Sequence, residues 1–458
     1  MPADLAVIGL GHLGLPLAQA AVAAGIETIG YDTDPRQLAE PAAGRTPADV
    51  RRMLSSGFRT VTDAAELGRV RTAAICAPTP LRGDGALDLS ALGEAARALA
   101  ARLRPHTTVL LESAVQPGTT ENFLRPILEQ GSGLRAGRDF HLAYSPSRVD
   151  PGSRTHGYAN TPKVIGGLTP ACTESAAAFY GRLTDKVVRA RGPREAETVK
   201  VLETNFRHVN IALVNEMAVL CHDLGVDLWD VIRCAETKPF GFQAFRPGPG
   251  VGGHGVPLDP SDPRNPRNPG DLSDLSDLGH PRDPRDSRDS RDPRDSGAPG
   301  GPDVPGVAPH TGRVPGHPLR MVGLAQEINS RMPRYVIQRC ATLLNEHGKS
   351  VRGARVLLLG ITYKPDLPDP ERSPATEIAR RLMDLGAAVS YHDPYVPDWR
   401  VRDVPVPRAD SLYEAAANAD LTVLLQHHRT YDLQGLAVKA QLLLDTRGAT
   451  PAGAAHRL

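Results

Sequence analysis

Over roughly the first 190 residues, short apolar runs alternate with alanine-rich stretches. The apolar runs predict strands at 5–9, 27–32, 72–77, 107–112 and 186–190. The stretches between them predict helices at 13–24, 35–40, 90–103 and 119–129. Strands that alternate with helices are typical of a parallel, doubly wound sheet with helices on both faces. The pattern therefore predicts an α/β domain over 1–190.

The period of the apolar positions changes after residue 193. Apolar residues recur there at spacings of three and four, namely Val199, Leu202, Phe206, Val209, Leu213, Met217 and Leu220. This spacing predicts a long amphipathic helix, and the stretch 320–347 has a helical pattern as well. We therefore expect a central helical region made of 191–260 and 319–347.

A second alternation of strands and a helix occupies 348–458. Its pattern predicts strands at 354–359, 387–392, 420–425 and 441–445, with a helix at 373–385. The fold class expected for the whole chain is thus α/β, with two Rossmann-like, doubly wound domains joined by a central helical region.

The segment 261–318 interrupts the helical region and differs from the rest of the chain. Its 58 residues include 12 Pro, 10 Asp, 8 Gly and 8 Arg, but only 8 hydrophobic residues. Such a composition buries too little apolar surface to offset the entropy of ordering. We expect a disordered insertion, which is either inert or a charged interaction tether.

Composition excludes several classes of protein. The 53 basic and 52 acidic residues leave a net charge of +1, which argues against a general nucleic-acid binder. The insertion carries −2, so the remainder carries about +3, which suits an anionic nucleotide. The chain has no apolar run of about 20 residues for a membrane span, and it begins without signal-peptide features. Its 5 Cys lack metal-ligand spacing, which favours a reduced, cytoplasmic protein without a metal.

A Gly-x-Gly-x-x-Gly motif follows the first predicted strand and opens the first helix. It consists of Gly9, Gly11 and Gly14, with His12 and Leu13 as spacers. Such glycines let the backbone approach a pyrophosphate at a helix N-terminus. Asp32 ends the next apolar run, where a carboxylate accepts from both ribose hydroxyls and favours NAD over NADP. The alternative is a tight turn plus a helix cap.

A loop rich in Gly and Pro over 245–259 resembles the active-site loop of the UDP-glucose/GDP-mannose dehydrogenase family, the nucleotide-sugar 6-dehydrogenases. Within that family it is most similar to the branch that acts on UDP-N-acetylhexosamines. Matching stretches include 112–120, 144–152, 210–216, 237–242, 360–366 and 391–395. Only 261–318 lies outside the resemblance.

The resemblance implies an architecture and a chemistry. NAD would bind the first domain, the central helix would also form a dimer, and the UDP moiety would lie between the glycine loop and the last domain. A UDP-sugar C6 alcohol would be oxidised to the acid in two hydride transfers, through a thioester on a Cys thiolate. The substrate-binding positions implied are Arg246, Gly250, Gly252, Gly253, Lys364 and Arg447. The last two could instead be plain surface cations.

The chain departs from the family at positions around this site. Gly255 occupies the position of the nucleophilic Cys, and without a thiolate the covalent route is closed. Ser147 aligns with the family's carboxylate, Ala114 with its Thr, and Thr204 with its Asn. The family's Lys and Asp are retained as Lys200 and Asp259. Further on, Glu371 and Arg372 are exchanged relative to the family order.

Two hypotheses follow from these departures. The chain is either a nucleotide-sugar dehydrogenase homologue with impaired activity, or a non-catalytic NAD- and nucleotide-binding scaffold. As a scaffold it would form a homodimer, or a heterodimer with an active paralogue. A third possibility is oxidation only as far as the aldehyde, supported by Lys200, Asp259 and water.

Overall fold

The computed structural model describes residues 3–32, 53, 55–80, 82, 87–149, 155–253 and 319–458. The predicted helix 35–40, the insertion 261–318, Gly255 and Asp259 lie outside these residues. In the part described, no helix is long and apolar enough to cross a membrane.

The first domain is built on a sheet with the strand order β3-β2-β1-β4-β5-β6-β7-β8. Its strands are β1 (Leu5–Ile8), β2 (Thr28–Tyr31), β3 (Arg59–Val61), β4 (Thr72–Ile75), β5 (Thr108–Leu111), β6 (His141–Tyr144), β7 (Lys163–Gly167) and β8 (Val187–Arg189). The order of the first six strands is that of a doubly wound dinucleotide-binding sheet. Because β6 and β7 pair antiparallel, the prediction of an entirely parallel sheet is wrong at that pair.

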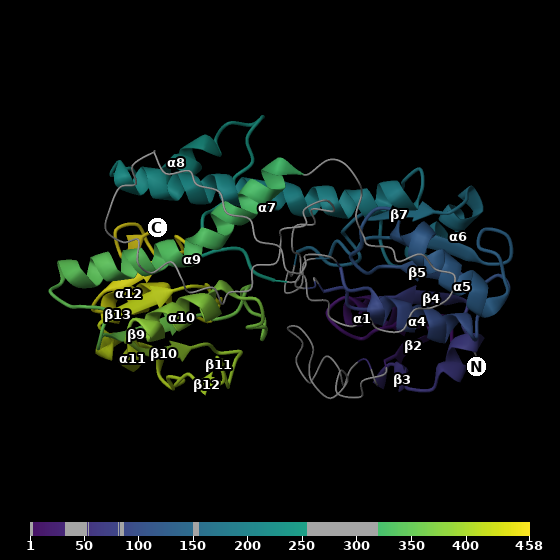
Figure 1. Cartoon of the computed structure of the whole chain (residues 1–458), viewed down its shortest axis with the longest axis horizontal. Helices are drawn as coiled ribbons and strands as arrows, with labels where there is room; N and C mark the ends of the chain where they lie inside the picture. The colour runs from purple at the N-terminus through teal and green to yellow at the C-terminus, as the bar shows by residue number, and fades with distance from the viewer. Residues whose placement is uncertain are drawn as a thin grey trace, which may run out of the picture.

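Helices cover both faces of this sheet (Figure 1). On one face, α1 (Gly14–Ala23) and α6 (Pro170–Tyr180) bury their apolar residues against the strands. On the other, α4 (Ser90–Ala100) and α5 (Arg125–Ser132) do the same. The helix predicted at 119–129 is in fact a π-helical turn, Thr120–Leu124, followed by α5. A 3-10 helix at Ala64–Arg69 precedes β4.

The central region consists of α7 (Pro193–Asp223), α8 (Leu228–Ala235) and α9 (Arg320–Glu346). The 31 residues of α7 make it about 46 Å long at 1.5 Å per residue. Along the predicted apolar stripe, Leu202 and Leu213 are 68% and 56% exposed. The stripe therefore faces outward, while smaller and polar residues of α7 face the protein.

The second domain contains a parallel sheet with the order β10-β9-β13-β14-β15. Its strands are β9 (Arg355–Leu359), β10 (Ala388–His392), β13 (Leu421–Leu424), β14 (Leu443–Asp445) and β15 (His456–Arg457). The helices α10 (Pro374–Asp384), α11 (Leu412–Asn418) and α12 (Leu433–Lys439) pack around it, beside a hairpin of β11 (Arg400–Val401) and β12 (Val404–Pro405).

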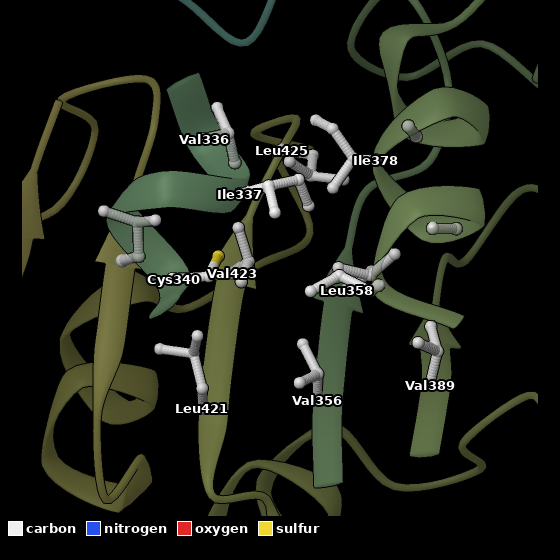
Figure 2. Packing of buried hydrophobic residues seen from close by; sticks show 14 of the residues in the cluster. Val336, Ile337, Cys340, Val356, Leu358, Ile378, Val389, Leu421, Val423 and Leu425 are labelled. Carbon is white, nitrogen blue, oxygen red and sulfur yellow. The ribbon is translucent and has the colours of Figure 1, made fainter. Parts of the chain in front are cut away.

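One face of this sheet is covered by α9 and α10. Figure 2 shows Val336, Ile337 and Cys340 of α9 above the strands, next to Ile378 of α10. The opposite face is covered by α11 and α12. Helix α9 thus belongs to the core of the second domain and also packs against α7. The predicted fold class is confirmed.

Candidate functional site

The glycine motif forms a backbone cradle between β1 and α1. Gly9 has a φ of 92°, and a Cβ there would lie 3.0 Å from the Cys76 carbonyl. A Cβ on Gly14 would lie 1.9 Å from the Gly9 oxygen, so only glycine allows α1 to start this close to the strand. Around Gly11, no described atom lies within 4 Å of the Cβ position.

The carboxylate of Asp32 closes this cradle on one side. Its Oδ2 atom accepts from the Leu10 N–H at 2.9 Å. No side chain caps the N-terminus of α1, so the positive end of the helix dipole adjoins the glycine turn, where the Leu15 N–H already donates to the Gly11 oxygen. An open Gly11, an uncapped helix and a carboxylate at the end of β2 fit a dinucleotide with free ribose hydroxyls. His12 and Leu13 lie half-buried in the same turn.

A buried ionic network lies beneath the neighbouring turn. Glu112 follows β5 directly, and its carboxylate accepts from Lys163 Nζ at 2.9 Å and Tyr180 Oη at 2.6 Å. Tyr158 Oη donates to the same carboxylate at 3.2 Å. The Glu112 and Lys163 side chains are 0% and 4% exposed. The one local signal of this network in the sequence is a charged residue, Glu112, at the end of an apolar strand.

The turn after Glu112 contains Ala114. Its carbonyl accepts from Thr79 Oγ1 at 2.6 Å, and its side chain is half-buried. The end of the turn is anchored on α7 by Glu197, whose carboxylate accepts from the N–H groups of Gly118 and Thr120. Burial raises the pKa of Glu197.

Lys200 lies one helical turn after Glu197. Its Nζ donates to the main-chain oxygen of Ser147 at 2.7 Å. Burial lowers the pKa of Lys200. The positive charges of Arg207, Lys163 and Lys364 lower this pKa further, whereas the negative charge of Glu203 raises it. Lys200 therefore lies against the backbone of Ser147, and the positive charge of Lys364 also acts on it.

Lys163 holds the preceding residue of the same loop. Its Nζ lies 3.3 Å from the Pro146 oxygen, so two lysines bind consecutive carbonyls of the chain after β6. Arg148 continues the pattern by donating to Glu203 at 2.8 Å and to the Pro162 oxygen at 2.7 Å. The loop 145–149 is thus fixed by three cationic side chains.

The start of the glycine- and proline-rich loop is pinned by two asparagines. Asn215 of α7 accepts from the Gly248 N–H at 2.9 Å and donates to Asn329 of α9 at 2.9 Å. Asn329 in turn donates to the His208 oxygen at 3.2 Å. This arrangement joins the loop to both central helices.

The loop then runs against the second domain. Gly250 and Gly253 have φ values of 133° and 94°. A Cβ on Gly252 would lie 2.5 Å from the Arg372 oxygen, and one on Gly253 would lie 2.7 Å from the Tyr363 ring. The close approach explains why glycine occupies these positions, whereas Arg246 before them is exposed.

Arg447 and Lys364 are both half-buried rather than surface cations. Arg447 Nε donates to the Leu425 oxygen at 2.7 Å, and its Nη1 would lie 2.9 Å from a Cβ on Gly248. Burial lowers the pKa of Arg447 to about 10, which leaves it charged at neutral pH. The guanidinium therefore lies against the glycine loop.

A second network missed by sequence analysis supports the loop that carries Lys364. Asp393 is fully buried and accepts from the Ile361 N–H and from His428 Nε2, both at 2.9 Å. His428 Nδ1 accepts from the Asp366 N–H at 2.9 Å, so the histidine is neutral. The network holds the chain on either side of Lys364.

The described residues form neither a reactive cysteine site nor a metal site. Cys76, at the end of β4, is 3% exposed, as expected for a packing residue. Cys234 is exposed on α8, far along the sequence from the lysine pair, beside Asp230 and Arg233. The part of the chain that the structure describes holds no group of three His, Cys, Asp or Glu suited to a metal.

Comparisons with known proteins match almost the whole chain. Models of the UDP-glucose/GDP-mannose dehydrogenase family match in three parts: the NAD binding domain over 3–184, the central domain over 194–263 and the UDP binding domain over 357–452. UDP-N-acetyl-D-mannosamine dehydrogenase of Methanocaldococcus jannaschii is 26% identical over 461 residues, covering 97% of this chain and 92% of that protein. UDP-N-acetyl-D-glucosamine 6-dehydrogenase of Pseudomonas aeruginosa is 29% identical, covering 86% and 83%.

Solved structures give the same picture. The structure of UDP-D-ManNAc dehydrogenase from Pyrococcus horikoshii matches with a TM-score of 0.76 and 27% identity, covering 98% of this chain and 97% of that one.

Proposed function

The chain belongs to the UDP-glucose/GDP-mannose dehydrogenase family, with an NAD-binding and a UDP-binding domain, and from this premise we propose that it binds NAD and a UDP-N-acetylhexosamine but is impaired in oxidising the sugar to the acid. The relatives named above act on UDP-N-acetylmannosamine or UDP-N-acetylglucosamine, which supports this sugar class. NAD as cofactor agrees with the predicted motif.

The first domain supplies the residues that would hold NAD. Gly9, Gly11 and Gly14 would lie against the pyrophosphate, and Asp32 would accept from the ribose hydroxyls. NAD, when bound, takes up the hydride that leaves the sugar alcohol. Asp32 is already oriented by the Leu10 N–H, so little side-chain entropy is lost on binding.

The observation that carries the proposed impairment is Gly255 at the nucleophile position. A glycine offers no thiolate to hold the aldehyde, so the second oxidation has no covalent route. Ser147 and Ala114 weaken the site further, because serine supplies no carboxylate at the first position and alanine no hydroxyl at the second. Lys200 and Asp259 would remain to orient water or the sugar hydroxyl.

Positive groups around the glycine loop support binding of the nucleotide diphosphate. Arg447 lies against Gly248, and Lys364 adds to the positive field at Lys200. The backbone of Gly250, Gly252 and Gly253 would line the sugar nucleotide. Arg246 is exposed at the start of this loop, and it would also contact the sugar nucleotide.

A restored nucleophile tests this proposal. Gly255→Cys should form little acid from UDP-N-acetylmannosamine, whereas the triple variant with Ser147→Glu and Ala114→Thr should form more. Gly323→Cys, which places a thiol on α9 in open space, is the matched control. Full activity in Gly255→Cys alone would show that only the nucleophile is missing. No gain in the triple variant would refute the assigned roles of Ser147 and Ala114.

A second candidate function is supported by the outward stripe on α7. Leu202, Phe206, Leu213 and Leu220 are exposed at spacings of four and seven along a helix. Such a self-complementary face suits another copy of α7. The alternative role is therefore that of a non-catalytic NAD- and nucleotide-binding partner, which dimerises with itself or with an active paralogue. Co-purification of such a paralogue from cells would support it, and a free homodimer alone would count against the heterodimer.

A further inference from the structure

Buried hydrogen-bond donors gather along the seam between the central helices and the second domain. We use "seam" for six residues: His222, Trp229, Tyr335, Arg339, His456 and Arg457. Four of their buried polar atoms have no partner in the described part of the chain, and these are Trp229 Nε1, Tyr335 Oη, Arg339 Nε and Arg457 Nε. Buried polar groups are nearly always paired, so such a group of atoms points to a missing ligand or solvent.

Arg339 of α9 is the central charge of the seam. It is 7% exposed, and its Nη1 lies 2.9 Å from His222 Nε2. Within the residues described, no carboxylate oxygen lies within 4.0 Å of its guanidinium. A buried cation without a counter-charge is costly, and an anion would relieve that cost.

The neighbours of Arg339 are donors or neutral histidines. Tyr335 lies one turn earlier on α9, on the same helix face. Burial lowers the pKa of both His222 and His456, and the charge of Arg339 lowers each further. His222 and His456 are exposed, so the group is open to solvent at its rim.

A rigid contact closes the other end of the seam. Arg457 lies 6.0 Å from the centre of the Trp229 ring, and Gly448 approaches that ring so closely that a Cβ would lie 2.3 Å from it. Figure 1 shows α8, the end of α7, α9 and the C-terminus on the same side of the molecule. The seam therefore joins α8 to the second domain.

Other charged groups act on the histidines of the seam. Asp223 on α7 and Glu346 on α9 favour the charged form of His222. Glu346 also favours the charged form of His456, whereas His347 disfavours that form. Asp223 and Glu346 are exposed, so water and salt screen them. Neither replaces a direct counter-ion for Arg339.

We propose that the seam is a binding site for a phosphate group, in which Arg339 is the principal cation and Tyr335 a hydrogen-bond donor. A guanidinium fork with a hydroxyl beside it matches the oxygens of a phosphate. The site is separate from the NAD cradle and from the glycine loop. A phosphate there would clamp α7, α9 and β15 together.

Thermal unfolding of the full chain tests this site with inorganic phosphate as the probe. No nucleotide is added, because NAD and UDP carry phosphate groups that would compete for the seam. Phosphate should raise the melting temperature of the wild type by about 2–4 °C over chloride at equal ionic strength. Arg339→Gln should lose this shift, and Arg334→Gln, an exposed position on the same helix, should keep it. An equal shift in Arg339→Gln would overturn the proposal.

Tyr335→Phe keeps the test decisive if Arg339→Gln does not fold. It removes only the hydroxyl and should weaken phosphate binding about tenfold by calorimetry. Unchanged binding in a folded Tyr335→Phe protein would reject the assigned donor. A parallel titration with UMP distinguishes sources of the phosphate: equal affinity means that the phosphate alone is bound, and tighter binding that Arg339→Gln abolishes identifies a nucleotide.

Discussion

The amine of Lys200 and the main-chain oxygen of Ser147 are joined by a hydrogen bond of 2.7 Å. Ser147 has no carboxylate in its side chain, and the lysine is held at this position by the backbone. The bond places the amine beside the loop after β6, where the positive charge of Lys364 also acts on it.

The environment of Lys200 predicts that its amine loses its proton at a lower pH than the amine of an ordinary lysine does. Burial disfavours the ammonium form and lowers the pKa. Labelling of Lys200 by acetic anhydride, followed by mass spectrometry, should reach half its maximum at a lower pH than labelling of the exposed Lys439. Coincident midpoints for the two lysines would contradict this.

The Glu112–Lys163 pair predicts a large loss of stability on breaking it from one side. Lys163→Met leaves a buried carboxylate without its counter-ion, which costs about 3–5 kcal/mol in the free energy of unfolding. Glu112→Gln combined with Lys163→Met should cost less than Lys163→Met alone. Denaturant unfolding measures both, with the exposed Lys186→Met as control. Equal losses for Lys163→Met and Lys186→Met would argue against a coupled pair.

The position of Asp32 predicts that its carboxylate contributes to the affinity for NAD. Asp32→Ala removes the ribose acceptor and the partner of the Leu10 N–H, so NAD affinity should fall by at least about tenfold. The exposed Glu27→Ala, just before β2, should bind NAD as the wild type does. Calorimetric titration gives both constants. Unchanged affinity in Asp32→Ala would reject the cofactor assignment.

The exposed stripe on α7 predicts that the chain dimerises through this helix. Leu213→Asp places a charge in the middle of the stripe and should convert a dimer into a monomer, as seen by light scattering. Val438→Asp, at a still more exposed position on α12, should leave the mass unchanged. A dimer that persists in Leu213→Asp would place the contact elsewhere.

Local signals in the sequence were sufficient for most of the fold. The bounds of the strands with long apolar runs were predicted within about two residues, because burial on both faces of the sheet leaves a continuous apolar run. The bounds of α9 were predicted equally well. The sequence did not predict β3, β6, β7 or α6. Arg59–Val61 is short and partly exposed, and α6 has no clear apolar periodicity, since 4 of its 11 residues are alanine.

The sequence could predict the residues of the site only where they belong to one local motif. The cradle of Gly9 and Asp32 depends on a single β-turn-α unit, which the spacing defines. Pairs such as Glu112 with Lys163, or Asn215 with Asn329, join residues 51 and 114 positions apart. Nothing in a single sequence indicates such contacts, because only the tertiary fold brings them together.

The formation of NADH by the purified wild-type chain tests the central claim most directly. The chain is mixed with NAD and UDP-N-acetylmannosamine, UDP-N-acetylglucosamine or UDP-glucose, and absorbance of NADH is followed. The account predicts calorimetric binding of NAD with little or no sustained NADH formation and no uronic acid. Steady turnover of any of these sugars to its acid would contradict it.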